Sequence, residues 1–159
     1  MSVLQNSAPL ARKAPILVKK GNNILLQRCV SQIDKFPVGE EVLDTIDLCK
    51  EGLRGASGFW KGRGMSIAAT QVGKPDVNLF LVCERKNWYT PRQYKTFQTV
   101  INPRITAYSE NLCLAWEGCV SNDDEMCLVE RPVQVKAAFQ DMKGKEYEML
   151  LTGLMSRIF

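Results

Sequence analysis

Residues 133–151 read VQVKAAFQDMKGKEYEMLL, and this stretch indicates how the chain folds. Apolar residues alternate with polar or small ones from Val133 to Phe139, which is the period of a strand with one buried face. Residues 141–144 carry turn-forming side chains, and a second strand-like run follows at 146–151. The two runs predict an antiparallel β-hairpin.

Outward from this hairpin, the sequence predicts strands at 78–83 and 97–101, the second stopped by Asn102-Pro103. A helix is predicted near 40–53, since apolar residues recur at helical spacing behind an acidic first turn. The glycine-rich stretch 55–64 predicts a loop. Because the strands are grouped after a helix rather than alternating with helices, the fold class is α+β.

The composition is that of one ordinary globular domain. The chain has 159 residues, of which 45% are hydrophobic and 24% charged, and a net charge of +4 that is scattered along it. This pattern favours a solvated surface over a nucleic-acid footprint, so we expect no direct DNA binding. No apolar run reaches the length of a membrane span, so no membrane insertion is expected. The chain has no histidine, which excludes Ser-His-Asp and Cys-His nucleophiles and any metal site built on imidazole within it.

Six cysteines are present without a C-x-x-C pair or a secretory signal, namely Cys29, Cys49, Cys83, Cys113, Cys119 and Cys127. We expect reduced thiols in an intracellular protein, most of them buried as small hydrophobic side chains. Residues 1–14 contain no acidic residue and predict a flexible N-terminal segment, with an organellar transit segment as the alternative.

The last residues predict the start of a helix. Thr152 is a suitable N-cap, and the apolar side chains that follow share one side of the helix: Leu154, Met155, Ile158 and Phe159. The sequence stops after about two turns on two large apolar residues, without a capping glycine or a polar end. We therefore expect this helix to be cut short.

Two segments carry candidate chemistry. In residues 62–73, small residues allow close backbone approach and Gln71 offers an amide that can donate to an oxyanion, although a tight turn under a sheet explains the pattern equally well. In residues 116–121, Cys119 follows a glycine and suits a metal-binding thiolate or a nucleophile. A buried structural thiol is the alternative reading of that cysteine.

Taken together and in this order, the segments resemble the first two motifs of peptide deformylases. Residues 64–71 match Gly-x-Gly-apolar-Ala-Ala-x-Gln except that Ser66 replaces the second glycine, and residues 117–121 match Glu-Gly-Cys-apolar-Ser completely. The flanks at 97–103, 130–132 and 153–159 are collinear with the family, so the resemblance covers residues 15–159.

The resemblance implies an α+β fold with mixed or antiparallel sheets around a central helix, here cut to its first turns. It implies a deformylase-like domain at 15–159 lacking its C-terminal part. The family activity is metal-dependent hydrolysis, with Fe²⁺ or Zn²⁺, that removes the formyl group from N-formylmethionyl nascent peptides during protein maturation. The protein is then cytoplasmic in a bacterium and mitochondrial or plastidic in a eukaryote.

Site roles carry over residue by residue. Cys119 is implied as the thiolate ligand of the metal, with two histidines of a third motif, Gln-His-Glu-x-x-Asp-His, completing the set. Gln71 and the backbone N–H of Val120 are implied to stabilise the oxyanion. The residues implied to contact the peptide are Gly64, Met65 and Ser66 in the groove, and Leu154 and Ile158 at the methionine pocket.

The departure from the family lies at the end of the sequence. The third motif is due immediately after Phe159, so its two histidines and its glutamate are absent from the 159 residues. We therefore expect a truncated family member that neither holds the metal nor deformylates as written. Two alternatives stay open: an inactive module that binds nascent peptides or the ribosome, and a metalloenzyme that combines Cys119 with carboxylates such as Glu117, Asp123, Asp124 or Glu125.

Overall fold

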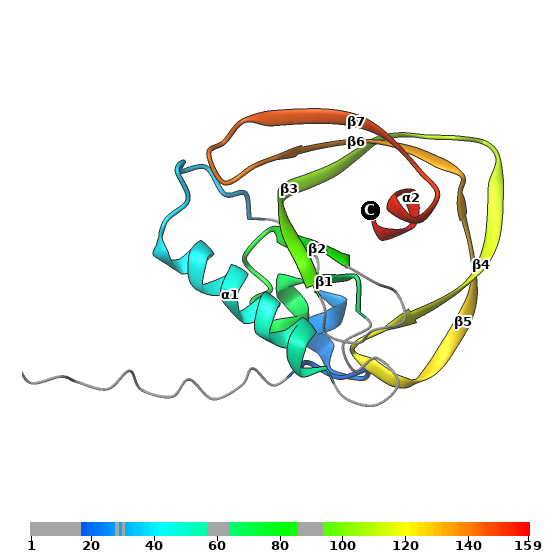
Figure 1. Ribbon diagram of the computed structural model, residues 1–159, viewed down its shortest axis with the longest axis horizontal. Coiled ribbons are helices and arrows are strands. Elements are labelled where there is room, and N and C mark those ends of the chain that lie inside the picture. The colour runs from blue at the N-terminus through cyan, green and yellow to red at the C-terminus, as the bar shows by residue number, and fades with distance from the viewer. Residues whose placement is uncertain (1–16, 28, 30, 57–63, 86–93) are drawn as a thin grey trace, which may run out of the picture.

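The computed structural model describes residues 17–27, 29, 31–56, 64–85 and 94–159 (Figure 1). In chain order its elements are η1 (Asn23–Leu26), α1 (Glu40–Gly55), β1 (Ser66–Ala68), η3 (Ala69–Val72), β2 (Leu79–Arg85), β3 (Tyr94–Tyr108), β4 (Leu112–Cys119), β5 (Asn122–Pro132), β6 (Gln134–Gln140), β7 (Glu146–Thr152) and α2 (Leu154–Ile158). The predicted α+β class is confirmed. The predicted N-terminal segment 1–14 and most of the predicted loop, residues 57–63, lie outside the described residues.

The main sheet has five strands in the order β1-β2-β3-β6-β7, with every neighbouring pair antiparallel. The predicted hairpin is its β6–β7 edge, where Gln140 pairs with Glu146. Its turn is closed by Asp141, whose carboxylate accepts the N–H groups of Lys143 at 2.8 Å and Lys145 at 3.0 Å. Gly144 adopts a φ of +83°, which a side chain would disfavour.

The principal core lies between α1 and the sheet. Cys49 and Leu53 on α1 and Leu81 and Ile101 on the central strands are fully buried, each at 0% exposure. The helix predicted near 40–53 is confirmed and continues to Gly55, with Glu40 and Glu41 in its first turn, where carboxylates favour the helix dipole. Burying this apolar stripe against the sheet is what stabilises the helix.

Strand β3 corrects one prediction. It does not stop at Asn102-Pro103 but continues to Tyr108, with a shift of its register against β6 between Ile101 and Arg104. Asn102 has a φ of 49°, a left-handed conformation that asparagine tolerates, and its side chain hydrogen-bonds the N–H and C=O of Ile33 at 2.9 and 2.7 Å. A bulge with its own polar contacts therefore carries the strand past the proline.

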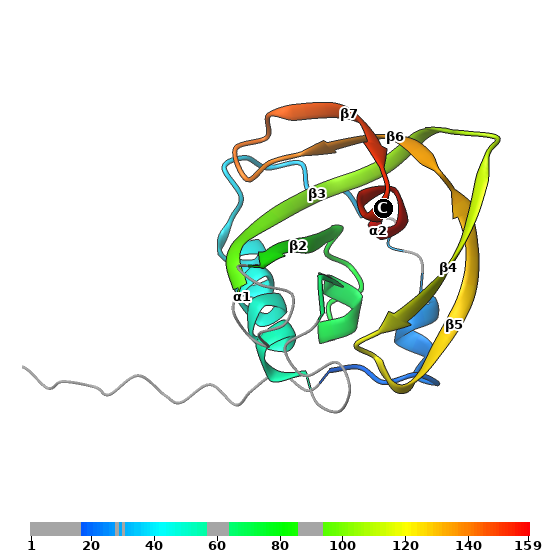
Figure 2. The same ribbon diagram turned by 45° about the vertical axis from the view of Figure 1, so that its right-hand side comes forward.

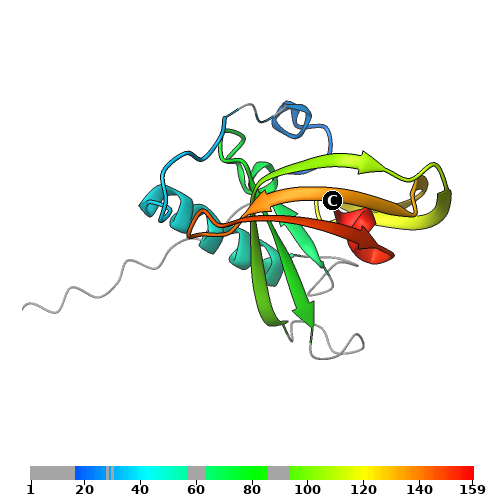
Figure 3. The ribbon, with the colours of Figure 1, turned by 90° about the horizontal axis from the view of Figure 1, so that it is seen from above.

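Strands β4 and β5 form a separate two-stranded antiparallel sheet. The periodicity of the sequence does not indicate that these strands lie outside the main sheet. Figures 1 and 2 show this sheet facing the main one, with α2 between the two. Seen from above, α2 lies beneath β6 and β7 and beside the β4–β5 hairpin (Figure 3). The second motif, residues 117–121, covers the end of strand β4 and the turn that joins it to β5.

Helix α2 begins at Leu154, and its N-cap is Gly153 rather than the predicted Thr152. Gly153 adopts a φ of +58°, and the hydroxyl of Ser156 donates to its carbonyl at 2.8 Å. Met155 and Phe159 pack on a second, smaller buried cluster at β6 and β7, whereas Leu154 is 46% exposed. The predicted apolar stripe is therefore only partly buried.

No helix of the described residues has both the length and the apolarity required to span a membrane. All six cysteines are described, and none forms a disulfide. The expectation that most are buried is wrong, since only Cys49 and Cys83 are, while Cys113, Cys119 and Cys127 are exposed. The three exposed thiols all belong to the β4–β5 hairpin, most of whose described residues are exposed.

Candidate functional site

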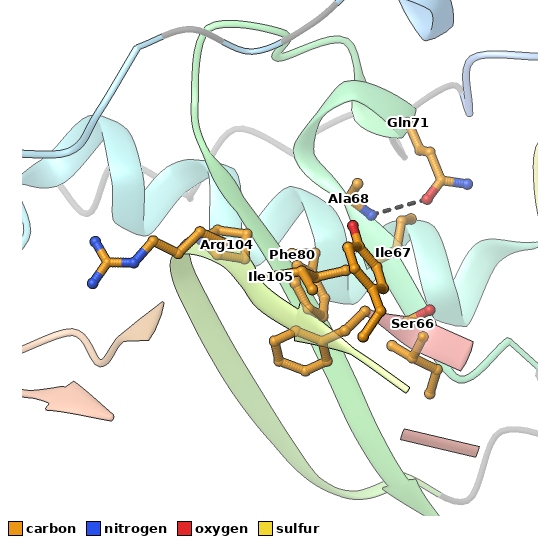
Figure 4. Close-up of a pocket in the computed structure, with 11 residues that line it drawn as sticks. Ser66, Ile67, Ala68, Gln71, Phe80, Arg104 and Ile105 are labelled. Carbon is orange, nitrogen blue, oxygen red and sulfur yellow. Dashed lines mark hydrogen bonds between the residues drawn. The ribbon is translucent and has the colours of Figure 1, made fainter. Parts of the chain in front are cut away.

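Gln71 lies in the short helix η3, directly after strand β1. Its side-chain oxygen accepts the N–H of Ala68 at 2.9 Å, the contact drawn in Figure 4. A backbone N–H can only donate, so the oxygen of the amide faces Ala68 and the Nε2 group faces the other way. The local turn therefore orients the amide without any ligand.

The Nε2 group of Gln71 meets the second motif. It donates to Cys119 Sγ at 3.3 Å and to Ser121 Oγ at 3.1 Å. Cys119 is exposed at the end of β4, whereas Ser121 is only 3% exposed in the following turn. Two motifs 48 residues apart are thus joined by a single amide.

The segment at residues 18–20 connects the same two motifs through its backbone. The N–H of Val18 donates to the C=O of Gln71 at 2.9 Å, and the N–H of Lys20 donates to the C=O of Ser121 at 2.8 Å. The ammonium group of Lys20 also pairs with Glu125. Since both of those side chains are more than half exposed, the backbone contacts contribute more than this ion pair.

Glu117, two residues before Cys119, is the centre of an ion-pair network. Arg131 donates to both carboxylate oxygens at 2.7 and 2.8 Å. Arg157 on α2 places Nε 2.8 Å from Oε1, an ion pair without hydrogen-bond alignment. The Arg131 guanidinium, assisted by Arg157, holds the pKa of Glu117 below its ordinary value despite partial burial.

Arg157 also ties α2 to both strands of the hairpin. Its terminal nitrogens donate to the carbonyl of Cys113 on β4 at 3.0 Å and to that of Val129 on β5 at 2.7 Å. Its side chain is only 13% exposed. The guanidinium therefore fixes the hairpin that carries Cys119 against the last helix.

A pocket of about 470 Å³ opens beside Gln71. It is lined by residues from β1, η3, β2, β3 and the end of the chain: Ser66, Ile67, Ala68, Gln71, Phe80, Pro103, Arg104, Ile105, Tyr108, Ile158 and Phe159. In Figure 4 the guanidinium of Arg104 points away from the other labelled side chains. Seven of the eleven lining residues are apolar, while Ser66, Tyr108 and the Gln71 amide add polar groups, the amide next to the motif-two turn.

Two of the five residues that were predicted to contact the peptide line this pocket. Ser66 and Ile158 line the pocket, whereas Gly64, Met65 and Leu154 do not. A Cβ at Gly64 would lie 2.8 Å from Leu53 Cδ2 and 2.9 Å from Val120 Cγ1, so close packing explains this glycine. Roles in peptide contact for these residues, and the oxyanion role of the Val120 N–H, stay predictions.

The metal centre that the resemblance implies is not matched by the donors of this chain. Such a centre needs a thiolate and two imidazoles, and the 159 residues contain no histidine. Among the described residues no three cysteine or acidic side chains cluster as metal ligands. Cys119 alone does not provide enough ligands to hold Fe²⁺ or Zn²⁺.

Within the described part of the chain, no arrangement of side chains supports a metal site made of Cys119 and carboxylates. Glu117 is occupied by two guanidinium groups and Glu125 by Lys20. The side chains of Asp123 and Asp124 lie outside what the structure describes. The described acidic groups near Cys119 therefore act as ion-pair partners.

The comparison with known families agrees with the motifs and the geometry. A family model described as polypeptide deformylase matches residues 15–159. The chain belongs to the peptide deformylase family. This family is metal-dependent, and the 159 residues given contain the Cys119 thiol but no imidazole.

Curated relatives include peptide deformylase 2 of Nostoc, which is 33% identical over 100 residues. That alignment covers 62% of this chain and 55% of the relative. A second relative, peptide deformylase of Synechocystis, is 31% identical over 63% of this chain and 51% of its own length. The chain thus spans about half the length of the curated relatives that it matches.

Among solved structures, a probable peptide deformylase from Synechococcus phage S-SSM7 superposes with a TM-score of 0.73 at 28% identity. The match covers 90% of this chain and 87% of the phage chain. The implied deformylase fold is therefore confirmed, with antiparallel pairing in every strand pair of the described residues.

Three contributors to the site had no role assigned from sequence: Ser121, Arg131 and Arg157. All three belong to segments that match the family, but nothing in their local spacing says which distant group they contact. Ser121 carried the best signal, since it ends the second motif. Arg157 carried none, because its acceptors come from β4 and β5.

The thiols provide a direct check on this arrangement. Burial raises the pKa of Cys49 to about 12, and Cys83 is buried with its Sγ 3.2 Å from the carbonyl of Gly64. We expect iodoacetamide to label Cys113, Cys119 and Cys127 in the native protein and to label Cys49 and Cys83 only in denaturant, because alkylation requires an accessible thiolate. Peptide mass spectrometry before and after urea measures this, and native labelling of Cys49 contradicts the packing of α1.

Proposed function

We propose that this chain provides the peptide-binding surface, the thiolate and the oxyanion-stabilising amide of a peptide deformylase site for N-formylmethionyl peptides. The observation that carries the proposal is the 3.3 Å contact between Gln71 Nε2 and Cys119 Sγ, which joins the two family motifs beside a pocket with both apolar and polar lining residues. The pocket suits an aliphatic side chain such as that of methionine, and the amide suits a carbonyl oxygen.

Both N–H bonds of the Gln71 amide are already used, one on Cys119 and one on Ser121. A formyl oxygen therefore has to take the place of one of these acceptors. The exchange is favourable at Cys119, because a hydrogen bond to a weak sulfur acceptor is replaced by one to a carbonyl oxygen. Hydrolysis itself requires imidazole ligands that the 159 residues lack, so this chain alone is proposed to bind without deformylating.

The test uses the 159-residue chain with formyl-Met-Ala-Ser and unformylated Met-Ala-Ser. In calorimetry we expect the formylated peptide to bind roughly two- to tenfold more tightly, the worth of one neutral hydrogen bond. Gln71→Met removes the donor, and the difference between the two peptides should vanish. Equal affinity of the unmodified chain for both peptides contradicts the proposal.

An inactive module that binds nascent peptides or the ribosome is the second candidate, favoured by the same lack of histidine. Formate release separates the two. With Zn²⁺ or Fe²⁺ and free imidazole at millimolar concentration, a chain that keeps a competent site should release formate slowly, and a binding module should release none. Cys119→Ser serves as the control, since it removes the thiolate.

A further inference from the structure

The side chain of Gln71 is held at three points, and only one of them belongs to Cys119. Its oxygen is fixed by the N–H of Ala68 at 2.9 Å. Its nitrogen has two N–H bonds, which reach Ser121 Oγ at 3.1 Å and Cys119 Sγ at 3.3 Å. Because the amide is planar, fixing one N–H on Ser121 also fixes the direction of the other.

Ser121 is suited to this role by its burial and its backbone. The residue is 3% exposed, and a buried hydroxyl oxygen that lost its donor would be left unsatisfied. The segment at residues 18–20 bonds the carbonyls of both Ser121 and Gln71, so the two residues keep their spacing. Cys119, in contrast, is exposed and can exchange its contact for a ligand or for water.

We propose that Ser121 is a positioning residue for Gln71: its hydroxyl holds one N–H of the amide so that the other is presented at Cys119 Sγ, where the formyl oxygen binds. The inference rests on the proposed function for the identity of the ligand. It adds that the ligand displaces the contact with Cys119 and leaves the contact with Ser121 in place. A weak sulfur acceptor is given up, and the stronger oxygen acceptor is kept.

The first test is made without any peptide. In Ser121→Ala, NMR should detect exchange of the Gln71 side-chain amide protons with water roughly two- to tenfold faster than in the unmodified chain. Ser121→Thr keeps the hydroxyl and should restore slow exchange. Ser156→Ala is the matched control, because Ser156 is also buried, at 4% exposure, but bonds the carbonyls of Val133 and Gly153.

The second test asks whether Ser121 acts through Gln71. The rate at which iodoacetamide labels Cys119 is measured by peptide mass spectrometry in Ser121→Ala, in Gln71→Ala and in the double variant. We expect Ser121→Ala to move the rate toward that of Gln71→Ala, and to change nothing further when Gln71 is already alanine. Independent, multiplicative effects of the two substitutions overturn the proposal.

Unchanged exchange of the Gln71 amide protons in a folded Ser121→Ala also overturns it. If Ser121→Ala does not fold, Ser121→Cys replaces the hydroxyl with a weaker acceptor of similar size and is measured in the same way. The two proposals fail separately. Equal affinity for formylated and unformylated peptide refutes the proposed function, whereas the exchange and labelling results concern the positioning of Gln71 alone.

Discussion

Replacing Arg157 with alanine is expected to lower the free energy of unfolding by about 3 kcal/mol. The guanidinium is 13% exposed, pairs with Glu117 and donates to two backbone carbonyls, one on each strand of the β4–β5 hairpin. Its removal takes the second guanidinium from Glu117 and the side-chain donor from both carbonyls, and it also removes the packing of a side chain that is itself mostly buried. Urea denaturation followed by circular dichroism measures the loss.

Arg131→Ala is the matched comparison, because Arg131 binds the same carboxylate but its side chain is 43% exposed. Its loss should cost about 1 kcal/mol, since an exposed pair is worth little and Glu117 keeps Arg157. Hydrogen exchange should also be faster in β4 and β5 of Arg157→Ala than in β6 and β7. Equal costs for the two arginines contradict the assignment of Arg157 as the link between α2 and the hairpin.

Gly64→Ala is expected to destabilise the protein by about 2 kcal/mol, and Gly64→Val by more. An added Cβ would lie 2.8 Å from Leu53 Cδ2 and 2.9 Å from Val120 Cγ1, and both side chains are fully packed, at 0% and 4% exposure. The side chains of Leu53 and Val120, or the backbone at residue 64, have to shift to accept the new atom. Because Val120 lies between Cys119 and Ser121, the movement should also weaken formyl-peptide binding.

Gly55→Ala is the control for this substitution. No described atom lies within 4 Å of a Cβ at Gly55, the last residue of α1, and alanine favours a helix over glycine. That variant should be as stable as the unmodified chain or slightly more stable. In a Leu53→Ala background Gly64→Ala should cost less, since one of the two atoms it meets has gone. An undiminished cost in the double variant argues against this contact.

Local patterns predicted the elements whose periodicity and turn residues can be read directly along the sequence. The alternation from Val133 to Phe139 and the turn at Asp141 located the β6–β7 hairpin, and helical spacing located α1 to within two residues of its end. Strand β3 was cut short at Asn102-Pro103, because proline usually ends a strand. Its continuation depends on contacts of Asn102 with Ile33, 69 residues away.

Some residues of the candidate site were also predicted from the sequence, and others were found only in the structure. The sequence named Gln71 and Cys119 because their motifs resemble those of a known family. It assigned no partner to Arg157, whose two carbonyl acceptors and ion-pair partner Glu117 lie on two other strands. It also left Gly64 as a groove residue, where the structure explains the glycine by the nearness of Leu53 and Val120.

By itself, the sequence determined the α+β class, the family and the donors available for chemistry, including the absence of histidine from the 159 residues. These follow from residue type and from spacing along the chain. Only the tertiary structure decided that one amide joins Cys119 to Ser121, and that one guanidinium joins α2 to the hairpin. Hydrogen bonds of this kind depend on distances of about 3 Å between segments far apart in sequence, and no local pattern encodes such distances.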